Sequence, residues 1–257
     1  MVTVRTKEMG VHLGRHAAVR GVTLDMPPGQ LVGIIGPNGA GKSSLIRAML
    51  GLVRLSAGSV AINGRDVAAL SRQEIARHIA YLPQGQTLHW PLAVERLVAL
   101  GRLPHLGPLS RLTPADEALV DAALARADVL HLKGRIATEL SGGERARVLL
   151  ARALAVGAPA LIADEPLASL DPGHQIDVME LLSAEARSGA LVVTVLHDLG
   201  MAARYCDRLI LMDRGEAVAD GPPMQVLTRA NLARVYGIDA WIGEEAGRPV
   251  ILPLSRV

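Results

Sequence analysis

Residues 31–50 read LVGIIGPNGAGKSSLIRAML, an apolar run followed by a glycine-rich loop and a segment with helical character. The run Leu31–Ile35 is short, apolar and rich in β-branched residues, which is typical of a buried strand. The loop matches the pattern G-x-x-x-x-G-K-[ST] through Gly36, Gly41, Lys42 and Ser43. Strand, loop and helix in this order predict a phosphate-binding loop rather than a glycine-rich structural turn.

The loop supplies the groups that bound phosphates need. Glycines let the chain curl so that successive N–H groups and the helix N-terminus face the phosphate oxygens. Lys42 adds a positive charge for the β- and γ-phosphate oxygens, and the Ser43 hydroxyl is a ligand for Mg²⁺. The nucleotide-contacting residues predicted in the loop are Gly36, Pro37, Asn38, Gly39, Ala40, Gly41, Lys42, Ser43 and Ser44.

Two adjacent acids follow another apolar run in the stretch ALIADEP. Asp164 is placed to hold Mg²⁺ through water, and Glu165 to polarise an attacking water as a general base. Paired acids at a strand end also serve as a solvated helix cap. The phosphate loop in the same chain favours the catalytic interpretation.

The rest of the chain reads as an α/β protein. Leu161–Ala163 and Leu191–Leu196 predict buried parallel strands, and Asn63-Gly64 predicts an antiparallel hairpin nearer the N-terminus. Between about residues 85 and 157, helix-period segments replace clear strand signals, so this stretch is predicted to be a helical insertion. The tail predicts a hairpin closed around Glu245–Arg248.

One helix start inside this insertion is well marked. Thr113 is the predicted N-cap, Pro114 suits the first helical position and Asp116 completes a capping box.

Composition excludes several classes of function. The 257 residues carry a net charge of +2 and include no Phe, two Trp and three Tyr, which argues against a nucleic-acid partner. A single cysteine, Cys206, excludes an intramolecular disulfide. The longest stretch without strongly polar residues, Ala153–Ala163, is too short for a membrane span. Five histidines are scattered without the spacing of metal ligands: His12, His16, His78, His89 and His105.

The stretch LSGGERAR, residues 140–147, places two glycines where a helix begins. A turn followed by an N-cap is the simple interpretation. The alternative is that Ser141, Gly142 and Gly143, which lack long side chains, expose a helix N-terminus to an anion.

These motifs resemble, over nearly the whole chain, the nucleotide-binding subunits of ABC transporters, in the order Gly36–Ser43, Gln84, Leu140–Glu144, Asp164–Glu165, Ser169–Asp171 and His197. The resemblance implies an α/β fold: a P-loop NTPase (RecA-like) core with an N-terminal antiparallel β subdomain and an inserted α-helical subdomain. Residues 1–257 would form one ATPase domain, with the core in 1–86 and 158–257 and the helical signature subdomain in 87–157.

In that family two copies meet head to tail, and ATP lies between the phosphate loop of one copy and the signature of the other. The signature residues that would act in trans are Ser141, Gly142, Gly143 and Glu144. The chain is therefore predicted to be an ATPase that uses ATP and Mg²⁺ and is inactive as a strict monomer.

Further roles follow from the resemblance, residue by residue. Gln84 in YLPQ resembles the glutamine that reaches Mg²⁺ or the attacking water, although a solvated loop glutamine is the alternative. His197 resembles the histidine that contacts the γ-phosphate, and with Gln84 and Glu165 it completes the predicted catalytic set. The predicted Mg²⁺ ligands are Ser43, Gln84 and Asp164.

Two assignments are less specific. Asp171 in SLD resembles the acid at the dimer seam, although Asp171-Pro172 also suits an N-cap and first turn. His12 stands where the family often stacks an aromatic ring on adenine, and an imidazole offers less area for that. His16 is nearby, and a surface histidine is the common case.

Within the family, three stretches resemble the ATPases of importers for iron siderophores, haem and cobalamin: Val98–Gly107, Arg72–Gln84 and Leu227–Ile238. The expected partners are a second copy of the chain, a membrane permease and, indirectly, an extracytoplasmic substrate-binding protein. The expected location is the cytoplasmic face of the cell membrane, peripherally bound. The rival function is a soluble ABC ATPase that acts as a mechanical clamp on nucleic acid or the ribosome.

Trp90 is one of only two tryptophans and precedes Pro91 at the start of the helical insertion. A surface tryptophan is typical of an interface anchor, here for the permease. Packing inside the helical insertion is the alternative.

Overall fold

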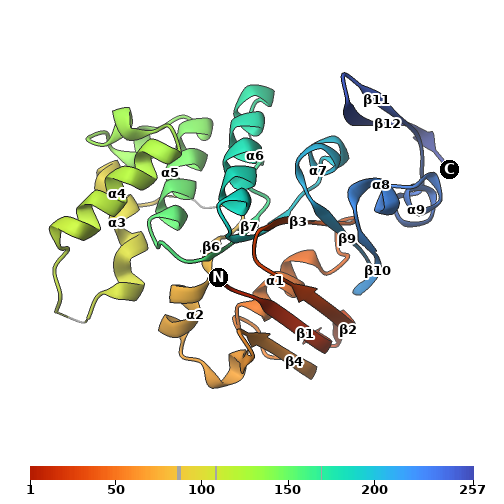
Figure 1. The fold of residues 1–257 in the computed structure, drawn as a ribbon, viewed down its shortest axis with the longest axis horizontal. Helices are drawn as coiled ribbons and strands as arrows, with labels where there is room; N and C mark the ends of the chain where they lie inside the picture. Colours follow the sequence, from red (N-terminus) through yellow and green to blue (C-terminus); the bar gives the residue numbers. More distant parts are fainter. Residues whose placement is uncertain (86–87, 108, 169) are drawn as a thin grey trace.

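The computed structural model describes residues 1–85, 88–107, 109–168 and 170–257. Its centre is a six-stranded sheet in the order β10-β9-β3-β8-β7-β6 (Figure 1). All neighbours pair in parallel except β9 and β10, which are antiparallel. The strands are β3 (Gln30–Ile35), β6 (Ala80–Leu82), β7 (Ala160–Asp164), β8 (Leu191–Val195), β9 (Arg208–Asp213) and β10 (Glu216–Gly221). The predicted parallel strands are confirmed.

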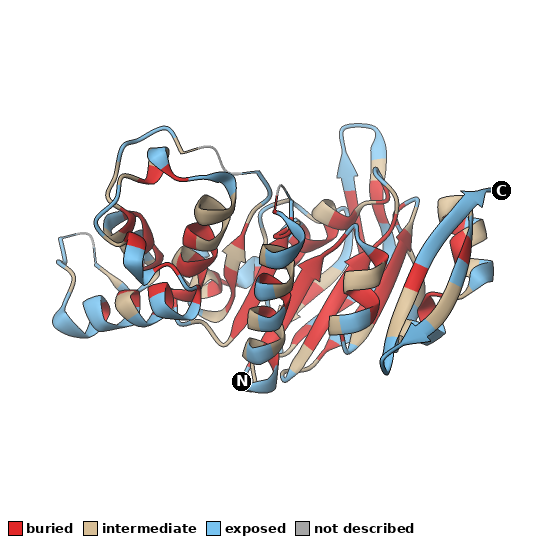
Figure 2. Cartoon of the chain, turned by 90° about the horizontal axis from the view of Figure 1, so that it is seen from above, coloured by how far each residue is buried: buried red, intermediate tan, exposed pale blue. Residues whose placement is uncertain are grey.

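The sheet is covered on both faces, which explains why its strands read as continuous apolar runs. Successive residues of β3 point to opposite sides, so Leu31 and Ile35 join one apolar cluster while Val32 and Ile34 join the other. Buried residues accordingly run through the middle of the molecule (Figure 2). Helix α1 (Lys42–Met49) packs in the second cluster. Helices α6 (Pro172–Arg187) and α7 (Leu199–Tyr205) pack in the first.

An antiparallel sheet packs beside α1 and carries the N-terminus. Its order is β2-β1-β4-β5, with β1 Val4–Leu13, β2 His16–Met26, β4 Ala57–Ile62 and β5 Arg65–Asp66. Asn63 and Gly64 join β4 to β5 with positive φ angles of 51° and 78°, as a two-residue hairpin turn requires. The predicted hairpin is therefore confirmed. The short η1 (Val67–Ala69) and α2 (Arg72–His78) follow.

The helical insertion is also confirmed. It contains α3 (Val94–Ala99), η2 (Leu100–His105), α4 (Pro114–Arg126), η3 (Leu130–Leu132), η4 (Ala137–Glu139) and α5 (Gly142–Leu154). Thr113 caps α4 with Asp116 in the predicted capping box. Its apolar side chains belong to the cluster that covers one face of the central sheet, so the insertion shares a core with the sheet. The proposed subdomain boundaries stay a prediction.

The chain ends in short helices and a hairpin. They are α8 (Pro223–Val226), α9 (Arg229–Asn231), η5 (Leu232–Tyr236), β11 (Ile238–Glu245) and β12 (Arg248–Arg256). The hairpin turns at Ala246-Gly247, as the sequence predicted, and β12 lies against α7. Within the described residues, the structure holds no helix with the length and apolar character of a membrane span.

Candidate functional site

The candidate site lies at the carboxyl edge of the central sheet. Parallel strands end at the same edge, so the residues that follow them meet there. Gly36 follows β3, Gln84 lies two residues after the end of β6, Asp164 ends β7, and His197 lies two residues after the end of β8. The fold therefore brings together residues that are far apart in the sequence.

The phosphate loop is shaped by backbone conformations that suit glycine. Gly41 caps α1 with a φ of 98°, and a Cβ there would overlap the carbonyl oxygen of Ala18. No side chain caps α1, and its first turn contains no acid. The first N–H groups of this helix are therefore available to an anion, as the motif predicted.

Lys42 lies inside the loop. The residue is 6% exposed, and Nζ donates hydrogen bonds to the carbonyl oxygens of Gly36 (2.7 Å) and Pro37 (2.9 Å). Burial lowers the pKa of Lys42, while the nearby carboxylates of Glu165 and Asp164 oppose that shift. A buried ammonium held by its own loop is positioned to meet an anion without a large side-chain rearrangement.

Asp164 has the surroundings of a cation ligand. It is 1% exposed, and its Oδ1 accepts a hydrogen bond from Ser43 Oγ at 3.3 Å. Its Oδ2 is buried and has no hydrogen-bond partner among the described residues. Burial raises the pKa of Asp164. An unsatisfied buried carboxylate oxygen beside a hydroxyl fits a hard cation such as Mg²⁺, which prefers oxygen ligands.

Glu165 is held between two of the predicted catalytic residues. Its Oε2 accepts a hydrogen bond from Gln84 Nε2 at 2.6 Å, and its Oε1 lies 2.6 Å from His197 Nε2. Glu165 also has a positive φ of 52°, a conformation that a non-glycine residue rarely adopts and that functional sites often contain. This arrangement can fix a carboxylate as an acceptor for a proton from water.

The signature stretch begins a helix. Ser141 is the N-cap of α5: its Oγ accepts from Glu144 N (3.3 Å), and Glu144 Oε2 accepts from Ser141 N (2.8 Å). These contacts with Ser141 lower the pKa of Glu144. The N-cap interpretation is thus confirmed locally, while the N–H groups of Gly142 and Gly143 lie in the first turn.

Two clefts meet at Glu165. The loop cleft is lined by Lys42, Ser43 and the rest of Asn38–Ser44, together with Leu13, His16 and Ala18. The signature cleft separates the acids Asp164 and Glu165 from Gly142, Arg145 and Ala146 at the start of α5. Glu165 lines both clefts, so it lies between the phosphate loop and the chain's own signature helix.

The seam acid adopts its alternative role. Asp171 is the N-cap of α6; its Oδ1 accepts from His174 N (3.0 Å), and its Oδ2 lies 2.5 Å from His174 Nδ1. The hydrogen bonds from His174 lower the pKa of Asp171. Ser169 lies outside the described residues. The sequence interpretation missed His174, whose position three residues after an N-cap acid could have revealed it.

The contact of His12 with adenine stays a prediction, and the loop cleft is lined by neighbouring residues. His12 is exposed on β1 and is not among the residues that line the loop cleft. Leu13 and His16 line it instead, and they are direct partners in the β1–β2 pairing. Successive strand residues point to opposite faces, so a shift of one position moves the side chain away from the cleft.

A strand, a phosphate loop and paired acids at the edge of a parallel sheet define a P-loop nucleotide-binding protein. The ABC transporter family profile matches residues 19–168. The chain is 45% identical over 252 residues to the Hemin import ATP-binding protein HmuV of Pseudomonas entomophila (strain L48), covering 95% of this chain and 97% of the relative. It is 48% identical over 233 residues to the protein of the same name from Nocardia farcinica (strain IFM 10152), covering 89% and 79%.

Solved structures agree with this fold. A chain described as a metal-chelate type ABC transporter in an inward-facing conformation is 23% identical and superposes with a TM-score of 0.86 over 98% of this chain and 97% of that one. A dimeric ATP-binding cassette bound to ADP and Pi is 26% identical, with a TM-score of 0.76 over 86% and 99%. The chain belongs to the ABC transporter family, and it is an ATPase of that family.

Proposed function

We propose that this chain is the ATP-hydrolysing subunit of an importer for haem or a similar metal chelate, working through a separate permease. The relatives named for hemin import are similar over nearly the whole chain, which supports this proposal. The observation that carries the catalytic part is Glu165, held between Gln84 and His197 beside the phosphate loop.

In this proposal the loop residues Gly36–Ser44 bind the ATP phosphates through N–H groups, with Lys42 adding charge. Ser43, Asp164 and Gln84 would hold Mg²⁺, which supplies charge neutralisation at the phosphate oxygens. Glu165 accepts the proton of the attacking water, and His197 orients Glu165 and contacts the γ-phosphate. The adenine base lies against Leu13 and His16, an aliphatic and imidazole surface that selects adenine weakly.

The signature residues Ser141, Gly142, Gly143 and Glu144 would act on ATP bound to a second copy in a head-to-tail dimer, with Asp171 at the seam. A dimeric family member bound to ADP and Pi supports a dimer as the working state. His174 lies next to Gly143 in the same chain and would link the seam to the signature.

Trp90 supports a docking role for the helical insertion. The residue is 75% exposed, so the alternative that it packs inside the insertion is wrong. We propose that Trp90 contacts the permease, and that the chain is bound peripherally at the cytoplasmic face of the membrane. An extracytoplasmic binding protein would deliver the cargo to the permease. The names of the relatives give the nucleic-acid or ribosome clamp no support.

The test is reconstitution of the chain in lipid vesicles together with a candidate permease. We expect ATP-dependent uptake of haem, which is abolished by Trp90→Glu, while MgATP binding by the isolated chain is unchanged. Cobalamin and a ferric siderophore are the competing cargoes. If the vesicles take up none of the three cargoes, the proposal is contradicted. Normal uptake with Trp90→Glu would place the docking surface elsewhere.

A further inference from the structure

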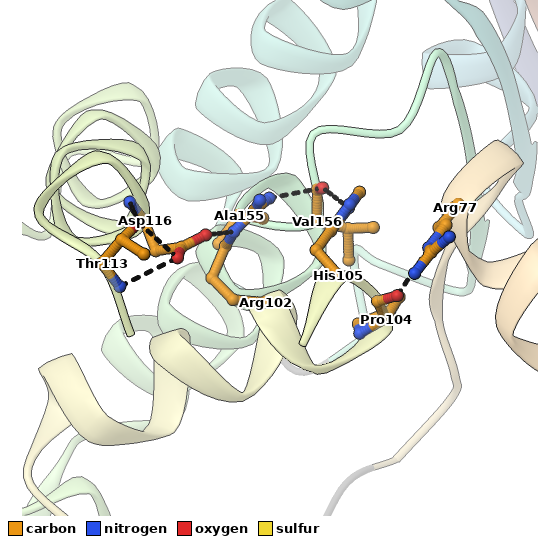
Figure 3. A network of polar contacts seen from close by, with 8 residues as sticks. All are labelled: Arg77, Arg102, Pro104, His105, Thr113, Asp116, Ala155 and Val156. Carbon is orange, nitrogen blue, oxygen red and sulfur yellow. Dashed lines mark hydrogen bonds and ion pairs between the residues drawn. The ribbon is translucent and has the colours of Figure 1, made fainter. Parts of the chain in front are cut away.

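Arg102 is a buried cation that the proposed catalytic set does not use. It is 7% exposed in η2, and it donates hydrogen bonds to carboxylate and carbonyl oxygens (Figure 3). Its Nε donates to Asp116 Oδ1 at 2.9 Å, and its Nη1 donates to the carbonyl oxygens of Ala155 (2.9 Å) and Val156 (2.8 Å). Burying a guanidinium is costly unless oxygen atoms accept hydrogen bonds from it. The acceptors around Arg102 must therefore stay in place for the side chain to remain buried.

The two carbonyls identify what Arg102 holds. They belong to the C-cap and the next residue of α5, where a helix leaves its last carbonyls without intrahelical partners and carries partial negative charge. His105 Nε2 lies 2.8 Å from the same Val156 oxygen. Gly101 lies against the backbone of this last turn, because a Cβ there would overlap the carbonyl oxygen of Arg152. Residues of η2 therefore bind the C-terminal end of α5, whereas the signature lies at its N-terminal end.

The other side of η2 is tied to the core. Arg77 Nε and Gln73 Nε2, both on α2, donate to the carbonyl oxygen of Pro104 at 2.7 and 2.9 Å (Figure 3 shows the Arg77 contact). Helix α2 leads directly into β6, which ends two residues before Gln84. Polar contacts therefore run from the core through η2 to the C-terminal end of α5.

Because α5 is long, a small change in its tilt at the C-terminal end moves the signature at the N-terminal end. Thirteen residues span about 20 Å, so a tilt of roughly 5° at the C-terminal end displaces the signature by about 2 Å. A misplacement of about 1 Å at a reacting site can lower a rate by as much as 100-fold.

We propose that Arg102 is a positioning residue that fixes the orientation of the signature helix α5 relative to the catalytic core. Arg102 holds the C-terminal carbonyls of α5, while Arg77 and Gln73 hold η2 on the core. The inference deepens the proposed function, since it concerns the site that acts on ATP bound to the second copy. Asp116 serves both Arg102 and the N-terminus of α4, where Thr113 N and Oγ1 donate to its Oδ2 at 3.0 and 2.7 Å. Two helices of the insertion therefore share one anchor.

The first experiment compares Arg102→Gln with Arg111→Gln, an exposed arginine in the same insertion. We expect Arg102→Gln to bind MgATP within about two-fold of the unmodified chain, because the phosphate loop is untouched, and to lose at least ten-fold in kcat. Arg102→Lys should recover only part of kcat, since an ammonium cannot span the same three acceptors. Arg111→Gln should change neither quantity. Unchanged kcat in folded Arg102→Gln overturns the proposal.

The second experiment measures, without nucleotide, the position of the chain immediately before the signature helix, which moves when the N-terminal end of α5 is displaced. Spin labels at Glu139→Cys beside the signature and Glu180→Cys on α6 report one distance, while the native Cys206 is buried and stays unlabelled. We expect the distance distribution to broaden with Arg102→Gln and to stay narrow with Arg111→Gln. An unchanged distribution with Arg102→Gln overturns the proposal.

Arg77→Ala covers the case in which Arg102→Gln does not fold. It removes the exposed hydrogen bond from Arg77 to the Pro104 carbonyl and leaves the buried Arg102–Asp116 pair intact. It should broaden the same distribution less and reduce kcat by a few-fold, and no change in either quantity would overturn the proposal. If the unmodified chain hydrolyses no ATP, the proposed function fails, while the distance measurement still decides the role of Arg102.

Discussion

The two helix N-termini that the proposed function assigns to phosphate, those of α1 and α5, are built in opposite ways. Helix α1 starts at Gly41 with no side-chain cap and no acid in its first turn, and Lys42 supplies a positive charge. Helix α5 starts at Ser141 with a complete capping box, and Glu144 puts a negative charge in its first turn. One end is prepared for an anion, while the other is satisfied by its own side chains.

The electrostatics of the two regions differ in the same sense. Burial dominates at the phosphate loop, where it raises the pKa of Asp164 and lowers the pKa of Lys42. Hydrogen bonds dominate in the helical insertion, where they lower the pKa of Glu144 and Asp116. The difference teaches that the phosphate loop presents free N–H groups within one chain, whereas the side chains of Ser141 and Glu144 already satisfy the signature helix end. Under the proposed function, the signature would act only when a second copy brings a phosphate to it.

The largest effect is expected from Glu165→Gln, which keeps the hydrogen-bonding shape but removes the base. Turnover should fall by a factor on the order of 10²–10⁴, while ATP still binds. Two copies should then close and accumulate as an ATP-dependent dimer in size-exclusion chromatography, which joins the two helix ends in one complex. Undiminished turnover would remove Glu165 from catalysis, and a persistent monomer would contradict the assignment of α5 to a second copy.

Lys42→Ala should weaken nucleotide binding at the phosphate loop, the first of the two helix N-termini compared. Loss of a charge-assisted contact of about 1.5–3 kcal/mol corresponds to a roughly 10- to 150-fold weaker Kd for MgATP, and hydrolysis should fall with it. Calorimetry on the monomer measures this directly. Near-normal binding would show that Lys42 is not the phosphate-facing cation.

Gly143→Ala should affect only the signature at the N-terminus of α5. A Cβ at Gly143 would lie 3.4 Å from His174 Nδ1, an ordinary contact, so the fold should be unchanged. MgATP binding by the monomer should stay normal, while turnover falls roughly five-fold, the equivalent of about 1 kcal/mol. Gly134→Ala is the matched control, since a Cβ there meets nothing within 4 Å. Equal effects of both substitutions on turnover would contradict a specific role for Gly143.

The smallest expected effect is a loss of stability of α4 at low pH. Hydrogen bonds from Thr113 and Arg102 lower the pKa of Asp116 from 3.8 to about 2. A carboxyl whose pKa is lowered in the folded state stabilises it fully above the unfolded value, and this stabilisation is lost as pH falls from about 4 towards 2. Amide-exchange protection in α4 should therefore decrease in this range before that of β3 and β8. Simultaneous loss of protection everywhere would contradict an independent weakness of the insertion.

Much of the fold could be predicted because local signals coincide with elements. The apolar run before Gly36 is β3, Asn63-Gly64 is a turn, and Thr113 caps α4. Which residue near the end of β1 lines the loop cleft was harder to predict, because one residue along a strand exchanges the two faces. His12 and Leu13 differ by that one step, and of the two only Leu13 lines the loop cleft in the tertiary structure.

The sequence by itself determined the chemical groups and their order: a phosphate loop at residues 36–44, adjacent acids at 164 and 165, and a glycine-rich helix start at 141. These patterns are local, because each is set by backbone freedom, charge and the spacing of a few residues. The tertiary structure alone decided which groups meet. Gln84, Glu165 and His197 lie within hydrogen-bond distance because three parallel strands end at one edge. Arg102 reaches the end of α5 because packing folds the insertion back on itself, and pairing across such sequence separations leaves no periodic signal in the chain.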